Sequence, residues 1–140
     1  MGKFFDEMEK ERGKNIFRGI GMNGRWHYGS LIHTTMGNTK TWISWSARGN
    51  GGWFNLISRA YVKPKTVGQF TGRFDKNDVP VFEGDIVKGK SHRGHEFVGV
   101  VGFRDCSFII KNDIASYYCW MDYEVEVIGN IHQNPELMEL

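Results

Sequence analysis

The strongest local constraint on the fold of this chain is a turn signal near its beginning, Asn23-Gly24. Both central residues of the tightest hairpin turns need a positive φ, which Asn and Gly tolerate best. Residues 16–20 and 25–32, on either side of this signal, have the apolar and aromatic composition of strands. They are predicted to pair as an antiparallel hairpin.

The rest of the chain continues the β pattern. Residues 41–47 and 53–62 flank the glycine-rich run 48–52, which predicts a second hairpin with a longer loop. Further strand-like segments follow at 67–71, 81–87, 97–103, 107–111 and 124–131. We therefore predict a mainly β fold of two small lobes, the second resembling an SH3-like barrel.

Short helices are predicted at the two ends. Near the N-terminus, Phe4, Phe5 and Met8 lie on one side of an amphipathic pattern, and at the C-terminus Asn134-Pro135 is typical of a helix start. The expected organisation is an N-terminal amphipathic helix at 1–12, a basic Trp-rich β lobe at 13–66 and an acidic barrel-like lobe at 67–140.

Charge is distributed unevenly along the chain. The formal net charge is only +2, yet the stretch from Arg12 to Phe74 contains ten basic residues and no Asp or Glu. From Asp75 to Leu140 there are six basic and twelve acidic residues. This separation predicts that the basic lobe binds an anionic partner or pairs with acidic surface, either within one subunit or between subunits.

Tryptophan and arginine alternate in the basic lobe, and an exposed Trp beside Arg is typical of surfaces that stack nucleotide bases. Trp42 and Trp45 are separated by an odd number of residues, so a strand places them on opposite faces. The predicted ligand-binding residues, for an anionic or base-stacking ligand, are Arg25, Trp26, Trp42, Trp45, Arg48, Trp53 and Arg59.

Two nucleotide-binding patterns occur by letter but lack the required context. Residues 84–91 match the Walker A pattern, which needs a strand before its loop and a helix after it. Here Ile86 and Val87 belong to an apolar strand, and residues 92–95 have no helical periodicity. Residues 19–24 match G-x-G-x-x-G but precede a predicted strand, so neither pattern predicts a nucleotide site.

Candidates for metal binding and catalysis are also weak. His92 and His95 have poor ligand spacing relative to Cys106 and Cys119, so no metal or other cofactor is expected. Glu83 and Asp85 could form a catalytic carboxylate pair, but a turn around Gly84 explains an Asp there equally well. We predict a protein without catalytic activity, and leave a hydrolase that uses these two carboxylates as an alternative.

Several blocks of sequence together resemble the YopX-like family of phage and prophage proteins. These blocks include Phe17-Arg18-Gly19, Gly68-Gln69-Phe70-Thr71-Gly72, Glu83-Gly84-Asp85-Ile86-Val87 and the segment 127–137. They span residues 17–137 in the family's order. The resemblance implies a viral accessory protein that is mostly β and self-associates, and it implies no reaction and no catalytic residues.

The predicted function follows from this resemblance and from the charge pattern. We expect a non-catalytic module that binds or sequesters a host component and counters a host defence protein or nucleotide signal. A nucleic-acid-binding module and a purely structural self-assembling protein are the alternatives. The expected partners are further copies of the chain and a host protein, nucleotide or nucleic acid. No apolar run is long enough for a membrane helix, so the host bacterial cytoplasm is the expected location.

Overall fold

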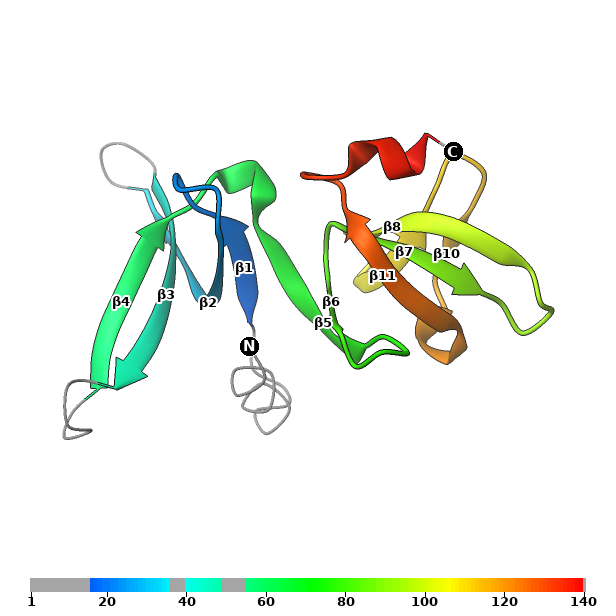
Figure 1. Ribbon diagram of the computed structural model, residues 1–140, viewed down its shortest axis with the longest axis horizontal. Coiled ribbons are helices and arrows are strands. Elements are labelled where there is room, and N and C mark those ends of the chain that lie inside the picture. Colours follow the sequence, from blue (N-terminus) through cyan, green and yellow to red (C-terminus); the bar gives the residue numbers. More distant parts are fainter. Residues whose placement is uncertain (1–15, 36–39, 49–54, 140) are drawn as a thin grey trace. The chain divides into compact units, whose positions relative to one another are not determined.

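The computed structural model describes residues 16–35, 40–48 and 55–139, and it confirms the mainly β prediction. The chain divides into two compact units, Asn15–Gln69 and the remainder from Phe70 onward, which we call the basic unit and the acidic unit (Figure 1). The predicted N-terminal helix at 1–12 lies outside the described residues, as does the loop 49–54 of the second hairpin.

The basic unit is an antiparallel sheet. Its strands are β1 (Phe17–Ile20), β2 (Trp26–Thr34), β3 (Lys40–Arg48), β4 (Asn55–Tyr61) and the beginning of β5 (Gly68–Phe74), in the order β4-β3-β2-β1-β5. The short 3₁₀ helix η2 (Pro64–Thr66) precedes β5. The later residues of β5 belong to the acidic unit, where Phe70 pairs with Phe82.

Both predicted hairpins of the basic unit are confirmed by the strand pairing. β1 and β2 are antiparallel with Ile20 opposite Trp26, and the turn between them contains Gly24 at a φ of 77°. The side chain of Asn23 accepts a hydrogen bond from the backbone N–H of Arg25 (3.0 Å), which stabilises this turn. β3 and β4 form the second hairpin, with Trp42 opposite Tyr61.

One face of the basic unit holds a small core. Ile20, Ile43 and Val62 are buried. The backbone N–H of Ile20 donates a hydrogen bond to Thr66 Oγ1 (2.8 Å). Gly29 lies in β2 next to the point where Ser30 pairs with Ser44 of β3. Its φ is 153°, and a Cβ added to it would come within 2.1 Å of the carbonyl oxygen of Ser44. The approach of these two strands therefore depends on a residue without a side chain.

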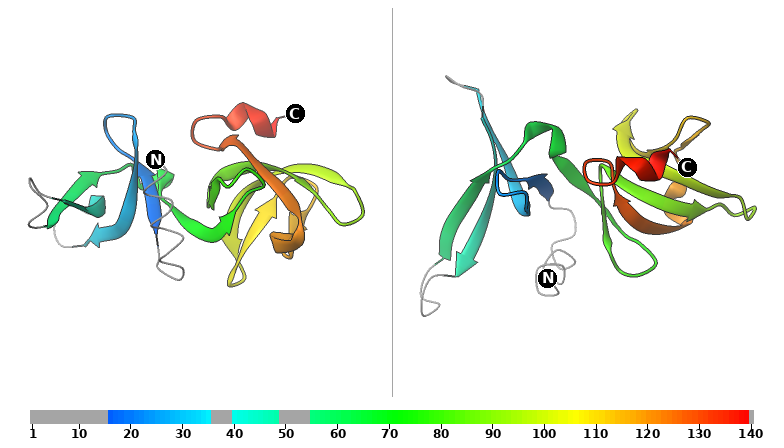
Figure 2. Two further views of the ribbon diagram at one scale, coloured as in Figure 1. Left: turned by 60° about the horizontal axis from the view of Figure 1, so that its bottom comes forward. Right: turned by 45° about the horizontal axis from the view of Figure 1, so that its top comes forward.

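The acidic unit contains a twisted five-stranded antiparallel sheet (Figure 2). The sheet has the order β10-β9-β8-β7-β11, and β6 (Pro80–Phe82) pairs with β5 beside it. The strands of the sheet are β7 (Asp85–Lys90), β8 (Glu96–Arg104), β9 (Ser107–Lys111), β10 (Ser116–Tyr117) and β11 (Glu124–Asn130). Two 3₁₀ helices, η3 (Trp120–Asp122) and η4 (Pro135–Met138), flank β11 in sequence.

Apolar residues of these strands and of η3 form the core of the acidic unit. The buried members are Val81, Val87, Phe97, Val101, Ile110, Trp120 and Val125. Burying an apolar side chain of this size contributes about 1.5–3 kcal/mol. The acidic unit therefore carries the larger of the two described cores, and the basic unit depends more on its hydrogen-bonded hairpins.

Arg73 fastens η3 to this core. Its guanidinium lies over the Trp120 ring, 5.0 Å from the centroid, and donates to the carbonyl oxygens of Trp120 and Tyr123. Burial lowers the pKa of Arg73, and the nearby carboxylate of Asp122 raises it. The side chain satisfies two carbonyls at the end of a helical turn, and so has a structural role.

Two finer parts of the predicted fold are not confirmed. Among the described residues β10 and β11 end the five-stranded sheet without pairing with each other, so the sheet does not close into a barrel and the SH3-like resemblance is not confirmed. The predicted C-terminal helix is a single 3₁₀ stretch, η4, in which the Asn134 side chain does not cap the turn.

The outer edge of β11 is covered by the loop that follows β5. The buried Asp75 carboxylate accepts hydrogen bonds from the backbone N–H groups of Asn77 (2.8 Å), Val79 (2.9 Å) and Val127 (2.8 Å). The backbone N–H of Lys76 donates to the carbonyl oxygen of Val125 (3.0 Å). One side chain therefore both shapes the loop and attaches it to the sheet.

Replacing Asp75 by Ala should lower the free energy of unfolding of the acidic unit by about 3 kcal/mol, because three backbone donors lose a charged acceptor. Asp75→Asn should cost less, since the amide oxygen can still accept from part of the loop. Urea unfolding measures both, with the exposed Asp113→Ala as the matched control. Equal stability of Asp75→Ala and Asp113→Ala would contradict the role assigned to Asp75.

Candidate ligand-binding face of the basic unit

The register of β3 and β4 places aromatic and basic side chains on one face of the sheet. Trp42 lies opposite Tyr61, and Ser44 lies opposite Arg59. Because side chains alternate along a strand, Lys40 and Trp42 share this face, and Ile43 points to the other, buried face. The hairpin thus separates a core face from a face that carries rings and cations.

The four side chains on this face contact one another in sequence. The rings of Trp42 and Tyr61 pack together, with centroids 3.3 Å apart and planes inclined by 30°. The Arg59 guanidinium lies 4.4 Å from the Trp42 ring centroid, and the Lys40 ammonium lies 4.9 Å from that of Tyr61. Lys40 Nζ also donates to the Tyr61 hydroxyl (3.2 Å). We call Lys40, Trp42, Arg59 and Tyr61 the aromatic–basic face.

Solvent reaches this face. Lys40 and Arg59 are exposed, Tyr61 is 38% exposed and Trp42 is half-buried. Two aliphatic side chains adjoin it in register, Ile32 opposite Trp42 and Ile57 opposite Ser46, and Ile57 is 82% exposed. A ligand could therefore contact rings, cations and aliphatic surface together without any rearrangement of the sheet.

The electrostatics of the face follow from the sequence. The basic unit contains no Asp or Glu, so its cations have no carboxylate of their own unit to pair with. The ring faces of Trp42 and Tyr61 provide the negative potential that holds Arg59 and Lys40 in place. Such a contact neutralises no charge, and both cations remain able to attract an anion.

The structure distributes the other sequence-predicted binding residues over different places. The guanidinium of the buried Arg18 lies over the Trp26 ring, 4.2 Å from the ring centroid. Arg25 is exposed in the β1–β2 turn. Trp45 stacks on His27, with centroids 5.4 Å apart. Trp53 and the side chain of Arg48 lie outside the described residues.

Trp42 and Trp45 do lie on opposite faces, as their spacing predicts. Of the predicted set, the structure brings Trp42 and Arg59 together. Sequence reasoning missed Lys40 and Tyr61. Lys40 could have been found from its two-residue spacing to Trp42, whereas Tyr61 requires the pairing register across the hairpin.

The segments that match the Walker A and G-x-G-x-x-G patterns form strands and turns in the structure. Residues 85–90 of the Walker A match form β7, which pairs with β8 and β11. Residues 19–24 of the G-x-G-x-x-G match form the end of β1 and its hairpin turn. Neither stretch opens a helix, so neither provides helix N–H groups to phosphates.

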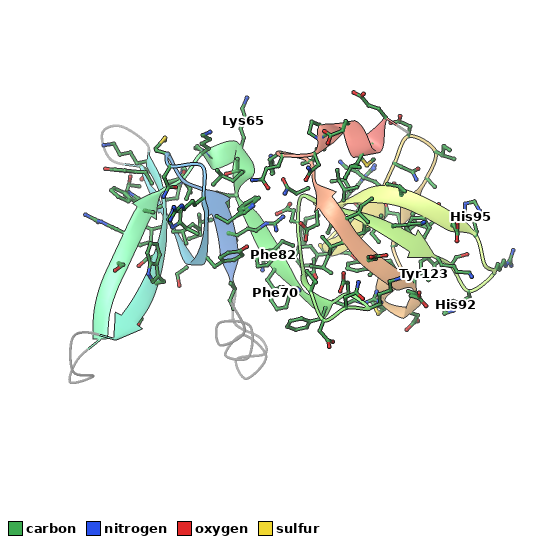
Figure 3. The ribbon with its side chains drawn as sticks, in the orientation of Figure 1. Lys65, Phe70, Phe82, His92, His95 and Tyr123 are labelled. Atoms are coloured by element: carbon green, nitrogen blue, oxygen red, sulfur yellow. The ribbon has the colours of Figure 1, made fainter. Side chains whose placement is uncertain are left out.

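Asp85, one of the two candidate carboxylates, has a structural explanation. Asp85 is 2% exposed, and its Oδ2 accepts a hydrogen bond from the backbone N–H of Phe82 (2.8 Å) across the β6–β7 turn. Figure 3 shows Phe82 next to Phe70, and their ring centroids lie 5.5 Å apart. Asp85 thus holds a tight turn next to the contact between Phe70 and Phe82.

The histidines and cysteines do not assemble a metal site in the part of the chain that is described, which contains no group of three or more His, Cys, Asp or Glu suited to a metal ion. His92 packs edge-on against Tyr123, with centroids 5.4 Å apart, and His95 lies apart from it (Figure 3). Cys106 and Cys119 are free and exposed.

A shallow groove of about 200 Å³ in the acidic unit is lined mainly by lysines and glutamates. Lys90 lies between Glu124 and Glu96 in the pairing of β11, β7 and β8. Lys76 Nζ lies 3.3 Å from Glu126 and 3.9 Å from Glu124. These charges largely satisfy one another, so the groove is a weaker candidate than the aromatic–basic face.

The model of the family described as YopX protein matches residues 17–139 of this sequence. The chain belongs to the YopX family. The match includes the Gly-Gln-Phe-Thr-Gly and Glu-Gly-Asp-Ile-Val blocks on which the resemblance rests, and these lie in β5 and at the entry to β7.

Among solved structures, this YopX family chain is similar to the crystal structure of protein EF1440 from Enterococcus faecalis. The TM-score is 0.48 and the sequence identity is 20%, over 89% of this chain and 98% of that one. No curated protein matches the sequence. None of the helices described in this YopX family chain has the length and apolar character needed to cross a membrane.

The contact between Arg59 and Trp42 in this YopX family chain should be measurable as a coupling energy. Arg59→Gln and Trp42→Leu, made singly and together, should show a coupling of about 0.5–1 kcal/mol in the free energy of unfolding by urea, the range for exposed cation–π pairs. The control cycle pairs Trp42→Leu with Lys65→Gln, whose side chain points outward from η2 (Figure 3). Strict additivity of the first pair would show that the contact contributes nothing to stability.

Proposed function

We propose that this YopX family protein is a phage or prophage accessory protein that binds and sequesters a component of the bacterial cytoplasm without catalysis. The observation that carries this proposal is the aromatic–basic face. Its two exposed cations lie on rings in a unit that has no acidic residue. Family membership supports the viral setting, because the YopX-like family that the sequence resembles is a family of phage and prophage proteins.

A binding role is favoured over a catalytic one because two buried carboxylates, one of them the candidate Asp85, serve the fold. Asp85 is buried with its carboxylate on a backbone N–H, and Asp75 accepts three such bonds. Carboxylates committed in this way are poorly placed to exchange protons with a substrate. The aromatic–basic face, in contrast, presents two exposed cations, and such cations attract anions.

The proposed binding can be tested with charge-reversed variants. Lys40→Glu combined with Arg59→Glu should abolish retention of the anionic partner that the wild-type protein captures from bacterial lysate, because like charges then oppose the ligand. The captured material is identified by native mass spectrometry, with and without nuclease treatment of the lysate.

The matched control reverses two exposed cations elsewhere, Lys65→Glu with Arg93→Glu, so that the net charge changes equally. This control should retain the partner. If the Lys40 and Arg59 double variant keeps the same partner at the same level, the aromatic–basic face is not the binding site and the proposal is wrong.

Self-assembly is a second candidate function, favoured by the edge of the basic unit. Among the described strands β4 pairs only with β3, and its Ile57 is 82% exposed. Such an edge offers backbone hydrogen-bonding groups and apolar surface to a second copy of the chain. Assembly of this kind would agree with the homo-oligomer expected from the family resemblance.

Placing a charge on this edge should disrupt such an assembly. Ile57→Lys is expected to shift the protein to a smaller species in native mass spectrometry, because a buried lysine at a strand–strand contact carries a large desolvation cost. Ile114→Lys, at an exposed position of the acidic unit, serves as the control. An unchanged mass distribution for Ile57→Lys would exclude β4 as the assembly edge.

A further inference from the structure

We propose that the ligand of the aromatic–basic face is single-stranded nucleic acid, with an unpaired base on the Trp42–Tyr61 pair and phosphates at Lys40 and Arg59. The proposal rests on the binding function proposed above and names the class of its ligand. Nothing in the family assignment specifies a ligand, and the inference comes from the order and chemistry of these four side chains.

The order of groups along the face is cation, aromatic pair, cation. Lys40 precedes Trp42 by two residues on β3, and Arg59 precedes Tyr61 by two residues on β4. Since the strands are antiparallel, the two cations lie on opposite sides of the Trp42–Tyr61 pair along the strand direction. Two residues of a strand span about 7 Å, so each cation begins one such step from the rings. A single strand presents phosphate, base and phosphate in the same order.

The two cations are suited to phosphate oxygens. The Arg59 guanidinium is held against the Trp42 ring, which restricts its orientation and leaves its N–H groups available at the edge. A guanidinium fixed in this way can bind a phosphate through two parallel hydrogen bonds. Lys40 Nζ donates one hydrogen bond to the Tyr61 hydroxyl and retains two N–H donors for a second phosphate.

The surroundings of the rings favour a base over an acidic peptide. Ser30 and Ser44 lie side by side in the row next to the Trp42–Tyr61 pair, and both are small. The Arg59 guanidinium covers the Trp42 ring, and the Lys40 ammonium lies over the Tyr61 ring in a contact of about 0.5–1 kcal/mol. An unpaired base, which contributes about 1–3 kcal/mol when stacked, can take the place of the Lys40 ammonium over the Tyr61 ring. The serine hydroxyls can then bond sugar or phosphate oxygens. An acidic peptide would use the cations but would gain little from exposed ring surface.

The same geometry favours single strands over duplexes. Bases in a duplex are stacked on one another and present only their edges and the phosphate backbone. A sheet face with aromatic side chains is a typical platform for unpaired bases, and each stacked base contributes about 1–3 kcal/mol there. Stacking on the Trp42–Tyr61 pair is therefore open to an unpaired strand and closed to a duplex.

Fluorescence anisotropy with a labelled oligothymidylate of about 12 nucleotides tests the proposal on the full chain. The wild-type protein should bind this oligonucleotide at low salt. Its affinity for the matching duplex should be lower by a factor of about ten or more. Thymidine monophosphate should not compete with the oligonucleotide for binding. Lys40→Gln with Arg59→Gln should reduce the slope of log affinity against log salt by about 1.4, for two lost phosphate contacts. Lys65→Gln should leave the slope unchanged.

Stacking is tested separately from charge. Trp42→Leu should weaken binding about tenfold at an unchanged salt slope, and Trp42→Phe, which keeps a ring, should recover most of the loss. Circular dichroism establishes that each variant is folded. If Trp42→Leu does not fold, the proposal is judged on the Trp42→Phe variant and on the Lys40→Gln, Arg59→Gln double variant. Both leave the packing of the hairpin nearly intact.

Three results would overturn the proposal: no binding of the oligonucleotide at low salt, equal binding of the duplex, or equal binding of the free mononucleotide. Failure here is distinct from failure of the binding function. If the oligonucleotide does not bind but a captured acidic protein is lost in the Lys40 and Arg59 charge reversal, the face is a binding site for protein. If that capture also survives the reversal, both proposals are wrong.

Discussion

The pairing register of β3 and β4 is the constraint on which the basic unit depends. A shift of one residue would turn Ile43 out of the core and carry Lys40 and Trp42 into it. Burial of Ile43 therefore fixes the register that assembles the aromatic–basic face. Core formation and presentation of the candidate site are two results of one hydrogen-bonding pattern, so mutations of the core should also affect the site.

The uneven charge of the chain has different physical consequences in the two units. In the acidic unit, lysines on β7 and in the Asp75 loop lie among glutamates of β8 and β11, and strand pairing brings the opposite charges together. In the basic unit no carboxylate is available, and aromatic rings take the place of counterions. Rings hold a cation without neutralising it, and this difference makes the basic unit the more plausible place for an anionic ligand.

Local sequence signals predicted local structure well. Asn23-Gly24 predicted the first hairpin because turn geometry depends on the turn residues themselves, and the odd spacing of Trp42 and Trp45 predicted their opposite faces. The barrel was not predictable in the same way, because closure depends on which strand edges meet. Tyr61 joins the face only through pairing across residues 49–54, and the three hydrogen bonds accepted by Asp75 include one from Val127, distant in sequence.

The loop that covers β11 also limits how the acidic sheet can grow. An uncovered edge strand is a template for cross-β association, in which further chains add to the sheet through the same backbone groups. Here Asp75 and the backbone of Lys76 occupy groups on that edge of β11. Addition of a foreign strand would first require the loop to detach. A single buried carboxylate thus helps to keep this edge of the sheet from pairing with a foreign strand.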